Sequence, residues 1–298
     1  MPQRLSGSTT ALLIAPPLFW AGNAVLARAL VGEFPPLALS FWRWTLAFAV
    51  LAPFAAASVW QHRSVILAHL QLLAWISLLG VGCYNSLQYL ALQTSTAVNT
   101  TLIGASGPAL ILITGAAFFS SRVVRRQWIG AAVSLLGVLW VIARGEPENL
   151  LRLQFALGDV IMLAATLAWS IYTWLLRTRR PPLPLTAFLA VQFGLGALMI
   201  LPFYLLEWSI TQHAPAPTPT NFAALIYVVL LPSLAAYYCW DRGVLRAGAV
   251  LPMYFVNLIP VFAAIFSWAL LNDPIGAYHL VGGALILAGI HLATERTR

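Results

Sequence analysis

Aromatic and polar residues recur at matching positions in two long apolar stretches of this sequence. Trp20 and Asn23 are three residues apart in the first stretch, and Trp169 and Tyr172 have the same spacing in the second. Residues three apart share one face of a helix, so each pair predicts a polar aromatic face. A shift of 149 residues superposes the pairs. Because both lie halfway along their stretches, we expect opposite walls of a cavity; an aromatic belt or lipid-facing packing is the alternative.

Further polar side chains interrupt other apolar stretches at similar depth. An amide in hydrocarbon must find a hydrogen-bond partner, so these groups should face the interior of the protein. There they either bind a solute or only hydrogen-bond neighbouring helices, and spacing does not separate the two roles. We include among the candidates for solute binding Tyr84, Gln88, Asn99, Tyr237, Tyr238, Tyr254 and Asn257.

Charged groups are scarce within the apolar stretches. Arg43, in the run FWRW, is the one ion placed deep in a stretch, and we expect carbonyl partners or snorkelling and a structural role for it. The acidic residues close to the stretches are expected at their ends, as caps or solvated groups: Asp159, Glu207, Asp241 and Asp273. The sequence therefore offers no carboxylate within the membrane as an obvious proton carrier and gives no positive sign of proton coupling.

Motifs for enzymatic or metal chemistry are missing from the sequence. It has no HExxH, no paired aspartate motif and no cluster of histidines with carboxylates. Cys83 and Cys239 both lie in apolar runs, which indicates packed thiols without a disulfide or a metal. We therefore expect no cofactor, and a membrane-embedded enzyme is the less favoured alternative.

The composition requires a membrane protein. Hydrophobic residues make up 61% of the chain and charged residues 8%, against about 25% charged in a soluble domain. Continuous apolar runs of about 20 residues predict helices, and alternation typical of a barrel is not seen. The runs number ten, at 9–31, 36–57, 67–92, 95–119, 126–143, 156–177, 184–206, 221–243, 247–271 and 275–293.

The arginines predict how the chain lies in the membrane. With both termini in the cytoplasm, the outer loops hold only Arg28, Arg144 and Arg152, while twelve of the sixteen arginines lie in inner loops and tails. This bias follows the positive-inside rule. The net charge of +8 therefore reflects topology and does not indicate nucleic-acid binding. We expect the inner (plasma) membrane.

The second half of the chain repeats the first. A shift of 152 residues makes nine of the 41 positions from Ala97 to Gly137 identical, where about four are expected by chance. Pro108 then falls on Pro260, and both prolines are candidate hinges. Five spans in each repeat, 1–145 and 154–298, make the second copy enter the membrane from the opposite side. Such inverted repeats are typical of transporters with a central cavity.

Several of these segments resemble a known family. YLALQTSTAVNTTLIGASGPALILITGAAFF, GDVIMLAATLAWSIYTWLLR and VLRAGAVLPMYFVNLIPVFAAIFSWALL are similar to the EamA-type repeat of the drug/metabolite transporter superfamily. The resemblance covers nearly the whole chain and implies ten helices around a cavity formed mainly by spans 1, 3, 4, 6, 8 and 9. Within the family the chain looks most like aromatic amino-acid exporters, whose cavity-lining aromatic positions correspond to Tyr84 and Trp169.

The combined expectation is a transporter in the lipid bilayer, acting as a monomer. It would export small neutral or zwitterionic metabolites, above all amino acids including aromatic ones, by alternating access of the two repeats. Aromatic faces suit apolar side chains, and amides or freed carbonyls suit the ends of a zwitterion. The alternative within the family is a carrier of another substrate class, such as a drug or a nucleotide-sugar.

Overall fold

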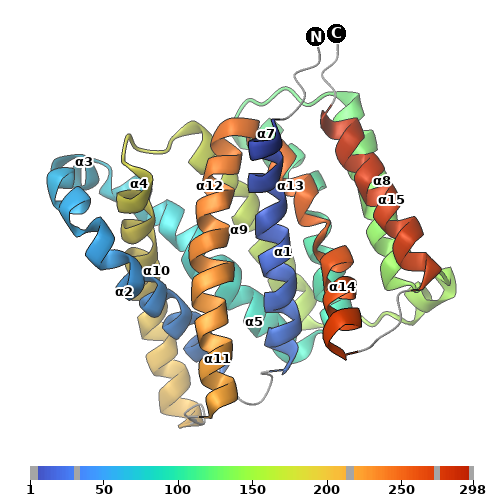
Figure 1. Ribbon diagram of the computed structural model, residues 1–298, viewed down its shortest axis with the longest axis horizontal. Coiled ribbons are helices and arrows are strands. Elements are labelled where there is room, and N and C mark those ends of the chain that lie inside the picture. The colour runs from blue at the N-terminus through green and yellow to red at the C-terminus, as the bar shows by residue number, and fades with distance from the viewer. Residues whose placement is uncertain (1–5, 30–33, 213–217, 272–275, 295–298) are drawn as a thin grey trace.

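A computed structural model describes residues 6–29, 34–212, 218–271 and 276–294 and shows an all-helical protein (Figure 1). No strand occurs within these ranges. Asp273 and its expected role as a cap lie outside them. The first half contains α1 (Gly7–Ala29), α2 (Pro36–Gln61), α3 (Arg63–Ala68), α4 (Leu70–Ser77), η1 (Leu78–Cys83), α5 (Tyr84–Thr94), α6 (Ala97–Gly104), α7 (Gly107–Phe118) and α8 (Arg125–Ile142).

A short 3₁₀ turn, η2 (Pro147–Arg152), leads into the second half of the chain. The first helix of the second half, α9, carries the buried carboxylate of Asp159 in its first turn. Asp159 accepts a hydrogen bond from the Ala156 amide at 2.8 Å and so caps the helix. The elements are α9 (Leu157–Thr178), α10 (Leu185–Thr211), α11 (Pro219–Val228), η3 (Val229–Ala235), α12 (Ala236–Ala247), α13 (Val250–Val256), α14 (Ile259–Leu271) and α15 (Ala277–Thr294).

The helices are long and apolar enough for a multi-pass membrane protein. Within the described ranges, seven helical stretches can cross a membrane by length and hydropathy, and one shorter apolar stretch spans Val250–Phe266. Large apolar side chains such as Phe54, Ile210 and Leu280 are more than two-thirds exposed, as expected for a surface that faces lipid. All ten ranges predicted from the sequence contain helical residues, but ten membrane crossings remain a prediction.

The main contacts between helices join elements that lie 149 or 152 residues apart in the chain. The most extensive contacts join α8 to α15 and α2 to α10, and each pair consists of elements at corresponding positions in the two halves. α5 packs on α9, and the elements at the corresponding positions, α12 and α1, also pack on each other. In Figure 1, α8 and α15 lie side by side at one edge, and α1 and α12 at the centre.

Two helical stretches are broken at positions 152 residues apart. α7 begins at Gly107 and α14 at Ile259, each after a short gap that follows α6 or α13. Pro108 and Pro260 each occupy the second position of the new helix, where the missing amide proton costs no hydrogen bond. The prolines therefore begin helices where kinks within continuous helices were expected, and movement about them stays a prediction.

Two further elements, η1 and η3, are π-helical and lie at corresponding positions. A π-helical turn leaves a backbone carbonyl without its usual intrahelical partner. The Gly80 carbonyl accepts from the Tyr237 hydroxyl at 2.5 Å. The Pro232 carbonyl, 152 residues later, accepts from Trp20 Nε1 and from Arg43 Nη2, both at 3.0 Å. Side chains from the other half of the chain thus satisfy the freed carbonyl in each half.

Candidate substrate pocket

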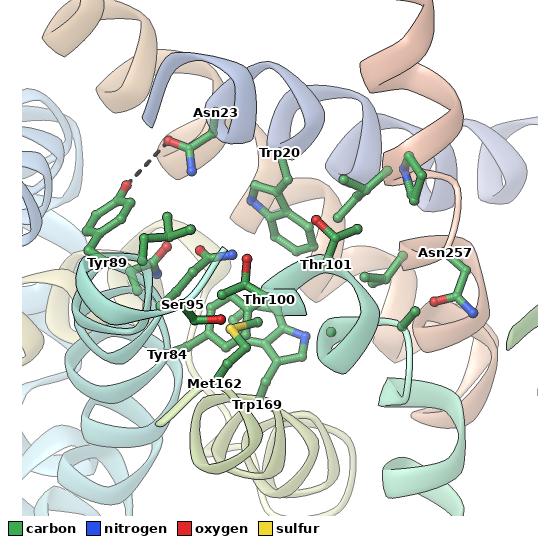
Figure 2. Close-up of a pocket in the computed structure, with 18 of the residues that line it drawn as sticks. Trp20, Asn23, Tyr84, Tyr89, Ser95, Thr100, Thr101, Met162, Trp169 and Asn257 are labelled. Carbon is green, nitrogen blue, oxygen red and sulfur yellow. Dashed lines mark hydrogen bonds between the residues drawn. The ribbon is translucent and has the colours of Figure 1, made fainter. Parts of the chain in front are cut away.

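A cavity of about 330 Å³ lies at the meeting point of α1, α5, α6, α9, α12 and the breaks before α7 and α14. Figure 2 shows Trp20, Asn23, Tyr84, Tyr89 and Trp169 arranged around it. Its size is at the small end of the range for small-molecule sites. The lining side chains that the structure describes include no charged group. A small neutral or zwitterionic molecule fits this cavity better than a large anion.

Aromatic rings close one end of the pocket. Trp20 and Trp169 meet edge to face with centroids 5.3 Å apart, and Trp240 lies 5.4 Å from Trp20 and 5.1 Å from Trp169. Tyr84 and Tyr237 pack on Trp169 at 4.8 and 5.6 Å. We call these five residues the aromatic floor. Each such pair contributes about 0.5–1.5 kcal/mol beyond the area it buries, so the floor is a rigid apolar wall.

The pocket extends from this floor toward one face of the molecule. Arg246 near the end of α12 donates to the Ser8 hydroxyl at 3.3 Å, so α12 ends where α1 begins; we call this side the termini face. The pocket residues Ser95 and Thr96 follow the end of α5, away from the termini face. The aromatic floor therefore separates the pocket from the termini face.

Polar groups line the other walls. Asn23 accepts a hydrogen bond from the Tyr89 hydroxyl at 3.3 Å (dashed in Figure 2), while Asn85 donates to the Tyr237 hydroxyl at 3.3 Å. The ends of the broken helices reach the same space through Gly104 and Ile259. Amides, hydroxyls and helix ends in one pocket can hold both the carboxylate and the ammonium group of a zwitterion.

Most residues predicted from the sequence do line this pocket. They are Trp20, Asn23, Tyr84, Gln88, Trp169, Tyr237 and Asn257; of the two candidate hinges, Pro260 also lines the pocket and Pro108 does not. Four others lie outside its lining, and each has an observable reason. Asn99 donates to the Gln154 carbonyl at 2.8 Å and to Asp159 at 3.1 Å, and Tyr254 donates to the Gln127 carbonyl at 2.6 Å. Tyr172 is buried beyond the floor, and Tyr238 is 41% exposed on the outer side of α12.

Several residues that line the pocket were not predicted from the sequence. Asn85, Tyr89, Ser95, Thr96, Thr100 and Thr101 all contribute to the wall. Asn85 and Tyr89 are spaced i, i+4 on one helix face, next to the predicted Gln88. The 152-residue shift also superposes Asn85 on Tyr237 and so could have identified it.

Arg43 is completely buried beside the pocket. Its Nη1 donates to Asn85 at 2.9 Å and to the Tyr89 hydroxyl at 3.0 Å, and its Nε donates to Ser233 at 2.6 Å. With the Pro232 carbonyl, four acceptors hold the guanidinium, and no carboxylate of the described residues is among its partners. The expected carbonyl partner is thus present, and Arg43 fixes the orientation of two pocket residues.

One expectation about charge is wrong. Asp241 was expected at the end of a span, but α12 continues to Ala247 and the Asp241 side chain is 0% exposed within a stretch that can cross the membrane. Its Oδ1 accepts from the Tyr172 hydroxyl at 3.1 Å. The reason is geometric: the charged run DRGVLR continues the helix, and Asp241 lies on the face packed against α9. Asp159 and Glu207 do act as caps: Asp159 accepts from the Ala156 amide at the start of α9, and Glu207 accepts from the Leu37 and Ala38 amides at the start of α2.

Comparison with known proteins agrees with this geometry. The sequence model of the EamA-like transporter family matches residues 7–143 and again 156–294. An uncharacterized transporter of Archaeoglobus fulgidus is 27% identical over 98% of this chain and 99% of its own. A probable terminal-alkyne amino-acid exporter of Streptantibioticus cattleyicolor is 25% identical over 99% and 95%. A solved crystal structure has the same fold, with a TM-score of 0.75 and 22% identity over 96% of both chains. The chain therefore belongs to the EamA-like transporter family, as its repeat segments indicated.

Proposed function

We propose that this protein exports amino acids, including aromatic ones, by alternating access of two inverted five-helix repeats. The observation that carries the proposal is the uncharged pocket bounded by the aromatic floor, with amide groups on the walls above it. Aromatic rings suit an apolar side chain, while the amides and helix ends suit the α-amino and α-carboxylate groups. One relative is named a probable amino-acid exporter, which is consistent with this assignment.

The inverted repeats supply the mechanism. The family match occurs twice, and the helix breaks, the π-helical elements and the main helix contacts all recur at corresponding positions. Two halves related in this way can exchange conformations, and the exchange opens the opposite side of the same site. With the termini in the cytoplasm, the pocket described above faces outward, and the aromatic floor seals the cytoplasmic side.

The test is amino-acid counterflow in proteoliposomes with the purified protein. Trp169→Ala combined with Tyr84→Ala removes two rings of the floor and should lower the initial rate at least about tenfold, since each lost aromatic contact weakens binding. The matched control is Trp75→Ala, because Trp75 is 53% exposed on the outer surface. Unchanged flux in the double variant would remove the proposed site.

A carrier of a larger or more anionic substrate is the second candidate within the family. A nucleotide-sugar would meet no charged side chain among the described lining residues of a cavity of about 330 Å³, which disfavours it. Competition of labelled phenylalanine counterflow by a panel of unlabelled amino acids, drugs and nucleotide-sugars separates the two. Inhibition by amino acids alone supports the proposal, and inhibition by nucleotide-sugars alone overturns it.

A further inference from the structure

The buried carboxylate of Asp241 has no role in the pocket itself, and its surroundings are unusual for an acidic group. One oxygen accepts from Tyr172, but Oδ2 is buried and has no hydrogen-bond partner among the described residues. An ionised carboxylate only accepts hydrogen bonds, and leaving such an oxygen unpaired in a buried site is costly. Binding of a proton removes the charge and turns the group into a donor.

A buried amide lies close by. Gln192 on α10 is 0% exposed, and its amide forms no hydrogen bond of good geometry with the described residues. This amide lies beside the Tyr172 hydroxyl and interacts with it, while Asp241 is bound to the same hydroxyl from the other side. A loosely held polar group in a buried site can change its partner when a neighbouring carboxylate gains or loses a proton.

The charged and titratable groups around Asp241 are few. On α9 they are Tyr172 and Arg177, and Arg177 donates to the Leu245 carbonyl at 2.9 Å. Arg180, in the connection between α9 and α10, is half-buried and lies over the Phe188 ring. Burial lowers the pKa of its guanidinium, while the charges of Asp241 and Tyr172 raise it. α13 contributes only Tyr254. The part of α1 from Gly7 to Gly22, the part of α10 from Leu185 to Gly196 and η3 contribute none. α12 itself carries Tyr237, Tyr238, Cys239, Arg242 and Arg246. An arginine stays charged at any physiological pH, so Asp241 is the carboxylate in this set that can change its charge.

Asp241 is connected to the pocket by direct contacts. Tyr172 packs on Trp169 with centroids 4.9 Å apart, and Trp169 lines the pocket. Trp240, the neighbour of Asp241 in α12, packs on both Trp20 and Trp169. A change at Asp241 therefore reaches the aromatic floor through a single side chain, Tyr172, or through its chain neighbour Trp240, which belongs to the floor.

The repeat places Asp241 opposite a pocket residue. Asp241 corresponds to Tyr89 at the 152-residue shift, and Tyr172 corresponds to Asn23 at the 149-residue shift. Tyr89 donates to Asn23 on the pocket wall, as Tyr172 donates to Asp241 on the other side of the floor. If the halves exchange conformations, the Asp241 pair comes to line a cavity open to the termini face.

On this basis we propose that Asp241 is the proton-binding site that links proton movement to substrate transport, an inference that rests on the proposed function. In the described conformation Asp241 is sealed between the floor and the termini face. In the exchanged conformation it faces the aqueous phase on the termini side, where the carboxylate and one proton interconvert with the carboxylic acid. No other bond changes.

The experiment uses the full-length protein in proteoliposomes with labelled phenylalanine and an internal pH-sensitive dye. Counterflow at equal pH reports the proposed function and needs no net proton movement. Flux under an imposed gradient of two pH units reports the coupling. In the wild type we expect the gradient to change the initial rate at least about threefold, and phenylalanine flux to change the internal pH.

Asp241→Asn should abolish the response to the gradient and the dye signal. Glu148→Gln, which removes an exposed carboxylate, should leave both at wild-type level. Wild-type counterflow without any effect of the gradient, or an Asp241→Asn protein that still responds to it, would overturn the proposal and leave the proposed function standing. Absence of wild-type counterflow would overturn both.

Asp241→Glu covers the case in which the asparagine variant has no counterflow. It keeps a titratable carboxylate and should restore both counterflow and the gradient response, with the pH profile of the rate displaced from that of the wild type. A glutamate variant that recovers counterflow but does not respond to the gradient, or recovers neither activity, counts against Asp241 as the proton site.

Discussion

Asn85 donates a hydrogen bond to the Tyr237 hydroxyl at 3.3 Å, and the two residues are 152 positions apart in the chain. This separation is the shift that superposes the second half of the sequence on the first. The two residues thus occupy corresponding positions and bind each other at the centre of the protein, on the wall of the pocket. The pocket lies where the halves meet and needs both to form.

Removal of the Tyr237 hydroxyl should weaken this central contact. Tyr237→Phe loses the bond to the Gly80 carbonyl and the bond from Asn85, both in buried surroundings. We expect a loss of about 1–3 kcal/mol in the free energy of unfolding. Tyr238→Phe is the matched control, because the neighbouring ring is 41% exposed; its effect should stay within about 0.5 kcal/mol. Thermal unfolding in detergent, followed by tryptophan fluorescence, measures both, and equal stabilities would contradict the assigned role.

The contact between α8 and α15 should tolerate no side chain at its crossing points. A Cβ at Gly137 would lie 2.7 Å from the Gly282 carbonyl oxygen, and a Cβ at Gly282 would lie 2.7 Å from that of Gly137. Because the obstacle is backbone, Gly137→Ala should destabilise the protein by about 1–3 kcal/mol and lower the unfolding temperature by several degrees.

The control for this contact is the adjacent glycine of α15. A Cβ at Gly283 would find only the Val261 side chain, at 3.8 Å, so Gly283→Ala should leave stability unchanged or raise it slightly. An unfolding temperature for Gly137→Ala equal to that of Gly283→Ala would show that the helices do not approach as closely as described.

Arg43 should be required for folding. Arg43→Gln leaves four buried acceptors without a charged donor, among them the Pro232 carbonyl and Asn85. We expect a loss of at least about 3 kcal/mol. Arg63→Gln, at an exposed position, should change stability by less than about 0.5 kcal/mol. Size-exclusion chromatography of the solubilised variants tests this, with aggregation expected for Arg43→Gln alone; a monodisperse variant of unchanged stability would refute it.

The aromatic floor should set the affinity for aromatic substrates. Trp20→Leu removes ring contacts with Trp169, Tyr237 and Trp240 and the hydrogen bond to Pro232. If the ring binds the apolar part of an amino acid, the KM for phenylalanine should rise about tenfold and that for alanine much less. An equal rise for both amino acids would instead indicate a general loss of structure.

The sequence by itself determined the membrane class, and it predicted the repeat and a part of the pocket lining. Apolar runs of fixed length follow from the thickness of the bilayer, and amides such as Asn23 and Gln88 inside them must face protein. The 152-residue shift aligned Pro108 with Pro260 and predicted a kink at each, and the structure begins a new helix there.

The tertiary structure decided which polar groups share the pocket and where the charges lie. Asn99 and Tyr254 have the same chemistry as Asn257 and Tyr84, but backbone carbonyls of neighbouring segments bind them outside the lining. Asp241 was assigned to the end of a span because the apolar run 221–243 stops two residues later, whereas packing of α12 on α9 buries it. The direction in which a side chain points depends on how helices rotate against one another, and that rotation is fixed by contacts between residues far apart in the chain.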